Sequence, residues 1–308
     1  MKYRVGIDLG GTNIAAGLVD ENMNILCQMS LPTQSERPYQ EIVRDMAVLV
    51  RGLVNMGNIS MEEVESVGIG SPGTPEKETG NILYSNNLGW NDVPLLAELG
   101  KYIPVPMKVD NDANCAALGE FLAGAAKGCK SAVMITLGTG VGGGIVLDGQ
   151  IYDGVNHAGA EIGHTVIVSG GELCTCGRRG CWEAYASATA LIRMGKEAAA
   201  ANPDSLLNSF EKLNGLTIFQ AADQGDEVAQ KVIDQYLFYV AEGLTNVVNV
   251  FQPEAVVIGG GICGQGEHIL KPIREQVAKD VFCKQISVPQ IVTATLGNAA
   301  GIIGAAFL

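Results

Sequence analysis

Positive charge is scarce in this sequence. Its 308 residues contain 20 Lys and Arg against 33 Asp and Glu, which gives a formal net charge of −13 at pH 7. A nucleic-acid surface needs clustered Lys and Arg to displace the counterions of the phosphates, and no basic stripe is present in the sequence. The composition therefore argues against a nucleic-acid partner.

Long apolar runs and linkers are also missing. The first residues, MKYRVGIDLGG, hold too short an apolar run for a signal peptide, and no segment approaches the ~20 residues of a membrane-spanning helix. No low-complexity stretch interrupts the chain. We therefore expect a cytoplasmic protein without a membrane partner.

A length of 308 residues, 47% of them hydrophobic, is enough for two domains with a cleft.

The stretch from His157 to Glu183 is the richest in reactive side chains. It contains a His-x9-Cys-x-Cys-x4-Cys pattern, formed by His164, Cys174, Cys176 and Cys181. These are the ligand types and the ligand number of a closed, structural zinc site. In a reducing compartment a Cys-x-Cys pair is more often a metal site than a disulfide. The alternative is four unrelated residues in a glycine-rich loop.

Two glutamates flank the metal motif. Glu161 is one helical turn before His164, and Glu183 is two residues past Cys181. A metal that fixes this loop also fixes the two carboxylates beside it. Such a pair suits the binding of a polyhydroxylated ligand.

Two segments of the chain repeat one another. VGIDLGGTNIAAGLVD, from Val5 to Asp20, aligns without gaps with VMITLGTGVGGGIVLD, from Val133 to Asp148, at an offset of 128 residues. Each predicts a strand, a glycine turn and a second strand, and the glycines let backbone N–H groups approach a ligand. A single turn of this kind is more often an ordinary hairpin. Two at matching positions indicate a duplicated chain whose turns hold one polyphosphate across a cleft.

Asp8 comes directly before the first glycine turn, and the equivalent residue of the second repeat is the neutral Thr136. A carboxylate directed at a phosphate needs a divalent cation between them, so Asp8 implies Mg²⁺. Otherwise Asp8 only caps the turn. The second turn, with Gly138, Thr139 and Gly140, would add hydrogen bonds to the phosphates.

Asp112 lies in DNDAN, at the start of a predicted helix. The helix dipole favours its charged form, which suits a general base that takes the proton of an alcohol during phosphoryl transfer. A lone Asp here is more often an N-cap. However, Asn111 and Asn114 can bind hydroxyls beside it. The loop SPGTPEKETGNILYSNNLGW adds Asn86 and Asn87, although by itself it is an ordinary surface loop.

The remaining chain alternates helices and strands, which indicates an α/β fold. Helices are predicted at 38–56, from 110–113 onward, and at 182–201, 227–251, 267–281 and 299–307, and strands at 66–70, 105–109, AVVIGGG and VPQIVTA. We expect the last helix to pack on the first domain. The predicted domains are then 1–110 with 297–308, and 111–296. The run Ile258–Gly261 between strand and helix suits either a close nucleotide contact or a simple tight turn.

With these motifs together, the chain resembles the ROK family of repressors and sugar kinases along essentially its whole length, and is most similar to that family's ATP-dependent glucokinases. DLGGTN, SPG, NNLGW, DNDAN, LGTGVGGG, HAGAEIGH, CTCGRRGCWE and VVIGGG occur in the family's order. The resemblance implies an actin-like and hexokinase-like (ribonuclease H-like) fold of two duplicated α/β domains, with the active site in the interdomain cleft.

The resemblance also assigns roles to individual residues. Asp112 matches the catalytic base, and the sugar contacts match Asn87, Asn111, Asp112, Glu161, His164 and Glu183. The predicted nucleotide site comprises Asp8, Gly10, Gly11, Thr12, Asn13, Thr136, Gly138, Thr139, Gly140, Gly259, Gly260 and Gly261. The expected cofactors are ATP, Mg²⁺ and structural Zn²⁺, and the expected assembly is a homodimer. Ala299 departs from the family pattern, because an acidic residue is frequent at this position near the nucleotide.

The predicted function is ATP-dependent phosphorylation of D-glucose to glucose 6-phosphate. A kinase for N-acetylmannosamine, N-acetylglucosamine or fructose would share most of these pocket residues. A repressor of the family needs a DNA-binding module before the first strand, and we expect none because DLGGTN lies so close to the first residue. A non-catalytic sugar-binding protein would have no use for Asp8 and two phosphate turns.

Overall fold

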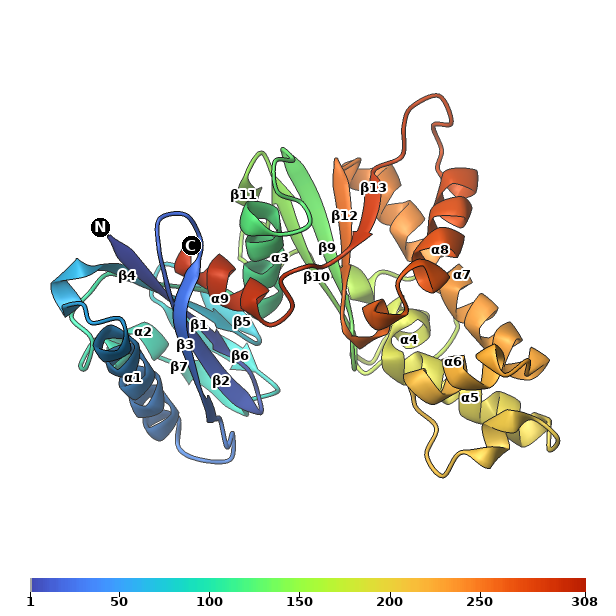
Figure 1. Cartoon of the computed structure of the whole chain (residues 1–308), viewed down its shortest axis with the longest axis horizontal. Helices are drawn as coiled ribbons and strands as arrows, with labels where there is room; N and C mark the ends of the chain where they lie inside the picture. Colours follow the sequence, from blue (N-terminus) through green and yellow to red (C-terminus); the bar gives the residue numbers. More distant parts are fainter. Residues whose placement is uncertain (1) are drawn as a thin grey trace. The chain divides into compact units, whose positions relative to one another are not determined.

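The computed structural model describes residues 2–308, and in that range it contains two five-stranded sheets and one three-stranded sheet (Figure 1). The first sheet has the order β3-β2-β1-β4-β8 and consists of β1 (Tyr3–Leu9), β2 (Asn13–Val19), β3 (Ile25–Pro32), β4 (Val64–Ser71) and β8 (Met107–Asn111). The second has the order β11-β10-β9-β12-β13 and consists of β9 (Ser131–Leu137), β10 (Val141–Leu147), β11 (Gln150–Ile151), β12 (Ala255–Gly259) and β13 (Gln290–Thr293). The small sheet comprises β5 (Thr74–Glu76), β6 (Asn81–Ser85) and β7 (Trp90–Val93).

The two large sheets repeat one arrangement. Strands β1 and β9, and likewise β2 and β10, begin and end 128 residues apart, with a glycine turn inside each pair. The remaining strands follow in the same spatial order on both sides of these pairs. The predicted repeat of strand, glycine turn and strand is therefore confirmed.

The helices agree with most of the predicted positions. They are α1 (Tyr39–Met56), α2 (Leu95–Leu99), α3 (Asp112–Ala123), α4 (Glu183–Ala186), α5 (Ala188–Ala201), α6 (Gly215–Asp223), α7 (Glu227–Phe251), α8 (Glu267–Asp280) and α9 (Ala299–Ala306). Short 3₁₀ helices are η1 (Met61–Glu63), η2 (Ile162–His164), η3 (Leu206–Ser209) and η4 (Gly261–Gln265). Over residues 2–308, none of the helices combines the length and the apolar character needed to span a bilayer.

Two predicted boundaries were wrong. The helix expected over 182–201 is interrupted at Ser187, because this residue leaves the helical conformation and its hydroxyl caps α5 by accepting the Ala190 N–H at 3.1 Å. The strand expected over 105–109 lies two residues later, so Asp110 and Asn111 still belong to β8 and the helix begins at Asp112.

The described chain forms two compact units. The first comprises the chain up to Met134 together with Gly144–Ala160 and Ala294–Leu308, and the second comprises Ile135–Gly143 and Glu161–Thr293. Helix α9 packs in the first unit against α3 and β1, as expected for the last helix. Helix α3 belongs to the same unit in this structure. The domain division at 110/111 and 296/297 stays a prediction.

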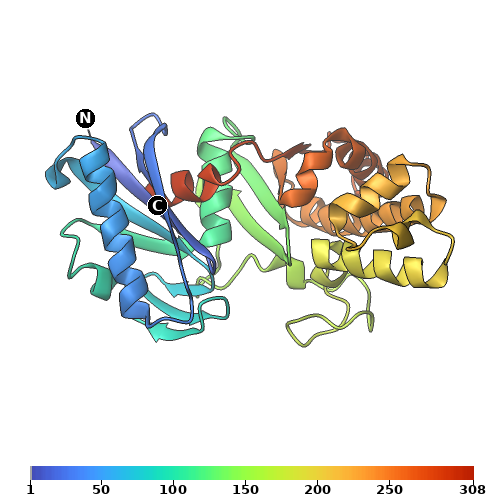
Figure 2. The same cartoon turned by 60° about the horizontal axis from the view of Figure 1, so that its bottom comes forward.

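Alternation along β1 assigns its side chains to two different layers. Val5, Ile7 and Leu9 are fully buried in one apolar cluster with α1, which runs along the first sheet (Figure 2). Because neighbouring side chains of a strand point to opposite faces, Gly6 and Asp8 face the other layer, which is α9. The strand therefore buries its apolar residues on one side and directs its carboxylate to the other.

Helix α9 contacts the sheet backbone directly. A methyl group added at Gly6 would lie 1.8 Å from the Ile302 carbonyl oxygen, and one added at Gly68 of β4 would lie 1.7 Å from that of Ala305. On the other side of α9, a methyl group added at Gly304 would lie 1.7 Å from the Cys115 carbonyl oxygen of α3. Glycines in the two strands and in α9 thus permit a contact between main chains that any side chain would prevent.

We predict that Gly68→Ala destabilises the protein by about 3 kcal/mol or more. This is the upper part of the usual range for overpacking, because the obstacle is backbone on both sides and cannot rotate away. Gly264→Ala is the control, since nothing lies within 4 Å of the added methyl group, and it should change stability by less than about 0.5 kcal/mol. Urea unfolding measures both. Equal stabilities of the two variants would contradict the contact.

Candidate functional site

The first glycine turn, Gly10–Thr12, is held by the residue that follows β3. Thr33 is fully buried; its hydroxyl donates to the Gly10 carbonyl at 2.6 Å, and its N–H donates to the Thr12 carbonyl at 2.8 Å. The Gly10 N–H closes the turn onto the Asn13 carbonyl at 2.8 Å. Together with Asp8 and Asn298, the turn lines a cavity of about 570 Å³. The turn is therefore a rigid backbone surface at the edge of an open space, as a phosphate-binding turn requires.

Asp8 lies at the end of β1, on the face covered by α9. A side chain at Gly301 would lie 2.9 Å from the Asp8 carboxylate, so this glycine provides the space for it. Burial and the nearby Asp112 raise the pKa of Asp8 to about 6. A buried carboxylate whose ionisation is opposed by a second carboxylate is a suitable environment for a divalent cation, which would relieve that repulsion.

Asp112 is the first residue of α3. The Ala113 N–H donates to its Oδ1 at 2.9 Å, and burial raises its pKa. The N-cap of the helix is Asn111 instead, whose Oδ1 accepts the N–H groups of Ala113 at 2.8 Å and Asn114 at 3.3 Å. Asn111, and not Asp112, therefore serves as the N-cap of α3. A carboxylate with a raised pKa is also a stronger proton acceptor when ionised.

Asn111 and Asn87 hold different positions in the same unit. The Asn111 amide nitrogen donates to the Gly73 carbonyl at 3.0 Å, so its side chain joins α3 to the SPG loop. Asn87 follows β6 and lies beside the first glycine turn, where a methyl group on Gly11 would be 3.3 Å from its carbonyl oxygen. The predicted sugar residue Asn87 and the predicted phosphate turn are thus close neighbours.

A charged cluster that the sequence did not reveal surrounds Asp110, two residues before Asp112. Asp110 is buried; its Oδ1 accepts the Asn111 N–H at 2.7 Å and the Asn114 side-chain amide at 2.9 Å, and its Oδ2 pairs with Lys77 Nζ at 2.5 Å. Lys77 also pairs with Asp153. Lys77 comes from the loop after β5 and Asp153 from the segment after β11, so only tertiary pairing could reveal the cluster.

The second glycine turn, Gly138–Gly140, is held by the segment 183–189, which contains α4 and the start of α5. The Ala188 N–H donates to the Gly138 carbonyl at 2.8 Å, and the Thr189 hydroxyl donates to the Thr139 carbonyl at 2.8 Å. Glu183 Oε2 accepts the Val141 N–H at 3.1 Å. Thr136 occupies in β9 the position of Asp8 in β1. The second turn therefore lies between two strands as the first does, but the strand before it carries no carboxylate at the position of Asp8.

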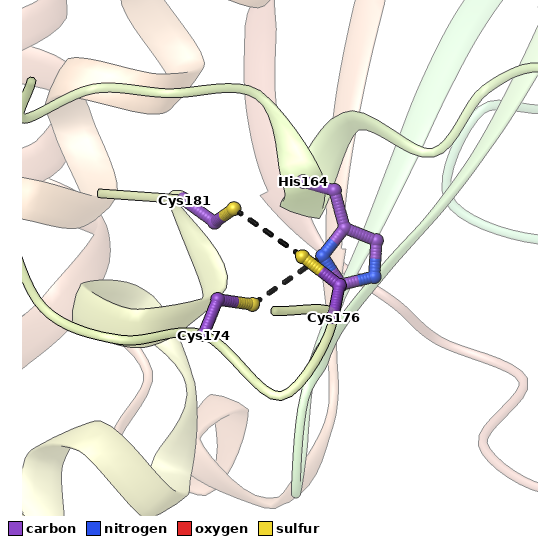
Figure 3. Close-up of side chains that lie close together, drawn as sticks. All are labelled: His164, Cys174, Cys176 and Cys181. Carbon is purple, nitrogen blue, oxygen red and sulfur yellow. Dashed lines mark hydrogen bonds between the residues drawn. The ribbon is translucent and has the colours of Figure 1, made fainter. Parts of the chain in front are cut away.

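The four predicted metal ligands converge (Figure 3). His164 Nδ1 lies 3.5 Å from Cys174 Sγ, Cys176 Sγ lies 3.7 Å from Cys181 Sγ, and all four ligand atoms lie within 4.8 Å of one another. A zinc tetrahedron with ordinary bond lengths has N···S edges of about 3.6 Å and S···S edges of about 3.8 Å. The donor types and spacings therefore fit a zinc ion.

Two of the three thiols of this cluster would be protonated without a metal, whereas a backbone hydrogen bond from Arg178 lowers the pKa of the third, Cys176. Burial raises the pKa of Cys174, and burial raises that of Cys181 to about 12. A bound divalent cation would displace these protons and hold the sulfurs as thiolates. Because His164 directs Nδ1 at Cys174, its Nε2 is the nitrogen left for another partner.

The two glutamates beside the cluster differ in their surroundings. Glu161 is exposed and immediately precedes η2, where its carbonyl accepts the His164 N–H at 3.0 Å. This single 3₁₀ turn replaces the α-helical turn assumed from the sequence. Glu183 Oε1 accepts the Thr175 hydroxyl at 2.9 Å, while its other oxygen accepts the Val141 N–H at 3.1 Å. The Glu183 carboxylate thus joins the loop that carries the four cluster residues, 164–181, to the second glycine turn. We call this loop the metal loop.

The glycines after β12 also have defined roles. Gly260 has a φ of +99°, and a methyl group there would lie 2.2 Å from the Leu137 carbonyl oxygen, so only glycine fits. Gly259 ends β12, and Gly261 begins η4 facing open space. A ligand could approach the backbone closely at this point. Ala299, the residue that departs from the family pattern, is the first residue of α9.

Comparison with known proteins gives full-length matches. The model of the ROK family matches residues 4–308. A glucokinase of Halalkalibacterium halodurans is 38% identical over 312 residues, which cover 100% of this chain and 94% of the relative. A glucokinase of Thermotoga maritima is 39% identical over 98% of this chain and 95% of its own. The crystal structure of a ROK family glucokinase from Streptomyces griseus in complex with glucose and AMPPNP has a TM-score of 0.81, at 36% identity over 99% and 98% of the two chains.

Proposed function

The chain belongs to the ROK family, and from this premise we propose that it is a glucokinase, which transfers the γ-phosphoryl group of ATP to the 6-hydroxyl of D-glucose. The full-length similarity to glucokinases, one of them bound to glucose and AMPPNP, supports both substrates. The main structural support for the chemistry is the pair of Asp8 and Asp112: Asp112 lies close enough to raise the pKa of Asp8, and a glycine turn lies beside Asp8.

In this proposal the two carboxylates have different roles. Asp112 accepts the proton of the sugar 6-hydroxyl as that oxygen attacks the γ-phosphorus. Asp8 holds the Mg²⁺ of MgATP, and bound Mg²⁺ supplies charge neutralisation on the phosphates. The backbone N–H groups of the two glycine turns and of Gly259–Gly261 bind the nucleotide. The proposed sugar contacts are Asn87, Asn111, Asp112, Glu161, His164 and Glu183.

The proposed zinc ion is structural. His164, Cys174, Cys176 and Cys181 would occupy all four positions of a tetrahedral ion, so no open position remains for chemistry. His164 would bind the metal through Nδ1 and present Nε2 to a sugar hydroxyl. The metal then orders a sugar-binding side chain without touching the reacting atoms. We further propose that the protein acts in the cytoplasm as a homodimer.

We predict that glucose has the highest kcat/KM among hexoses tested with MgATP. A coupled assay over glucose, mannose, glucosamine, N-acetylglucosamine, N-acetylmannosamine and fructose measures this directly. Sites that hydrogen-bond individual hydroxyls can reject analogues strongly, but rejection of a bulky 2-substituent depends on local geometry. A higher kcat/KM for either N-acetylhexosamine or for fructose would refute the glucose assignment and leave the kinase mechanism in place.

We predict that Asp112→Asn lowers kcat at least ~100-fold, because the amide keeps the shape of the side chain and loses its basicity. Affinity for a non-hydrolysable ATP analogue should change little. Asp204→Asn is the control, since Asp204 is an exposed residue of the second unit, and it should retain wild-type kcat. Near-normal turnover by Asp112→Asn would remove Asp112 from the role of base.

We predict one zinc ion per chain in untreated protein. Cys176→Ser should lose most of this zinc, and should raise the KM for glucose or become insoluble, because the metal loop also carries Glu161 and Glu183. Cys283→Ser, which changes a thiol outside the cluster, should keep both zinc and KM. Elemental analysis of purified protein decides the matter, since fully active enzyme without zinc would exclude the site.

A further inference from the structure

The two glycine turns are equivalent in the repeat, but they are supported in different ways. The first is held by Thr33, at the end of the eight-residue strand β3. The equivalent strand of the second sheet, β11, has two residues and pairs with β10 only at Val146 and Leu147, the end of β10 away from the turn. A residue placed like Thr33 is therefore missing from the second sheet over the described part of the chain.

The segment 183–189 takes over this support. The Ala188 N–H and the Thr189 hydroxyl donate to carbonyls of the second turn, both at 2.8 Å, and the Glu183 carboxylate accepts the N–H of Val141, the residue directly after the turn, at 3.1 Å. The Glu183 carboxylate also lies directly over Gly140, where a methyl group would be 2.3 Å from Oε2. The conformation of the turn thus depends on how this segment is placed.

The metal loop in turn places the segment. Cys181, one of the four clustered ligands, is separated from Glu183 only by Trp182, which is fully buried and donates its indole N–H to the Tyr239 carbonyl at 2.8 Å. From the other side, Thr175, between two cysteine ligands, donates its hydroxyl to Glu183 Oε1 at 2.9 Å. Each oxygen of the Glu183 carboxylate is therefore bound to a different structure, one to the metal loop and one to the glycine turn.

We propose that the metal loop sets the conformation of the second phosphate turn, with Glu183 and Thr189 as positioning residues. The inference rests on the proposed function, because it takes the turn to bind nucleotide phosphate. Its consequence is specific: loss of the metal, or of these hydrogen bonds, weakens nucleotide binding as well as sugar binding. A metal that served only the sugar residues would leave nucleotide affinity unchanged.

The test measures binding of AMPPNP and of glucose separately by calorimetry. In Thr189→Val, AMPPNP affinity should fall about fivefold, the usual effect of losing one hydrogen bond, while glucose affinity stays within about twofold. Thr189→Ser keeps the hydroxyl and should restore binding. Ser209→Ala is the control, because it removes another hydroxyl-to-carbonyl bond of the same unit, from Ser209 to Leu206.

A second arm tests the metal loop itself. Thr175→Val alters an exposed residue and should keep zinc, yet weaken AMPPNP binding about threefold to fivefold through Glu183. Zinc-depleted protein that remains folded by circular dichroism should lose at least as much. Normal AMPPNP binding by Thr189→Val and Thr175→Val, or by folded zinc-depleted protein, would overturn the inference.

The wild type separates this inference from the proposed function. Wild-type protein that binds AMPPNP and phosphorylates glucose upholds the kinase, and variants that match it then refute only the coupling between metal loop and turn. Wild-type protein that binds no nucleotide refutes the kinase and, with it, the inference.

Discussion

The direct packing of α9 on the backbone of β1 and β4 is the contact on which the first unit depends. It exists because Gly6 and Gly68 have no side chains, and it brings the helix so close that a methyl group would overlap a carbonyl oxygen. Asp8, two residues beyond Gly6 on the same face of the strand, then lies against α9. The same helix packs on α3 and so fixes the helix that begins with Asp112. This glycine-mediated contact therefore helps to hold Asp112 close enough to Asp8 to raise the pKa of Asp8.

In the second unit, the glycine turn is held in place by different contacts. Its glycine turn has the same backbone pattern as the first, but the strand that supports the first turn has shrunk to two residues on this side. An irregular loop cannot by itself hold a turn rigidly, because ordering each of its residues costs about 1–2 kcal/mol of conformational entropy. The convergence of His164 with three cysteines and the buried Trp182 reduce that freedom. In our proposal this loop therefore serves nucleotide and sugar together.

Much of the fold and of the His/Cys cluster could be predicted from the sequence. The repeat at an offset of 128 residues is confirmed at both pairs of strands, since strand and turn preferences are local. The convergence of His164 with three cysteines also followed from short spacings. In contrast, the pairing of Lys77 with Asp110 and Asp153 had no sequence signal, because each partner belongs to a different loop. The roles of individual sugar and nucleotide residues stay proposals.

By itself, the sequence determined the strands, the glycine turns, most helices and the four residues of the His/Cys cluster, all of which depend on residues close to one another along the chain. The structure decided which residue caps α3 and where the long helix breaks at Ser187, and tertiary packing decided which segment supports each glycine turn. Asn111 caps the helix because β8 runs to that residue, which leaves Asp112 free of that task. The physical reasons differ: the two helix caps are local hydrogen bonds that compete with other local choices, whereas the supports of the turns join residues far apart in sequence, which only packing brings together.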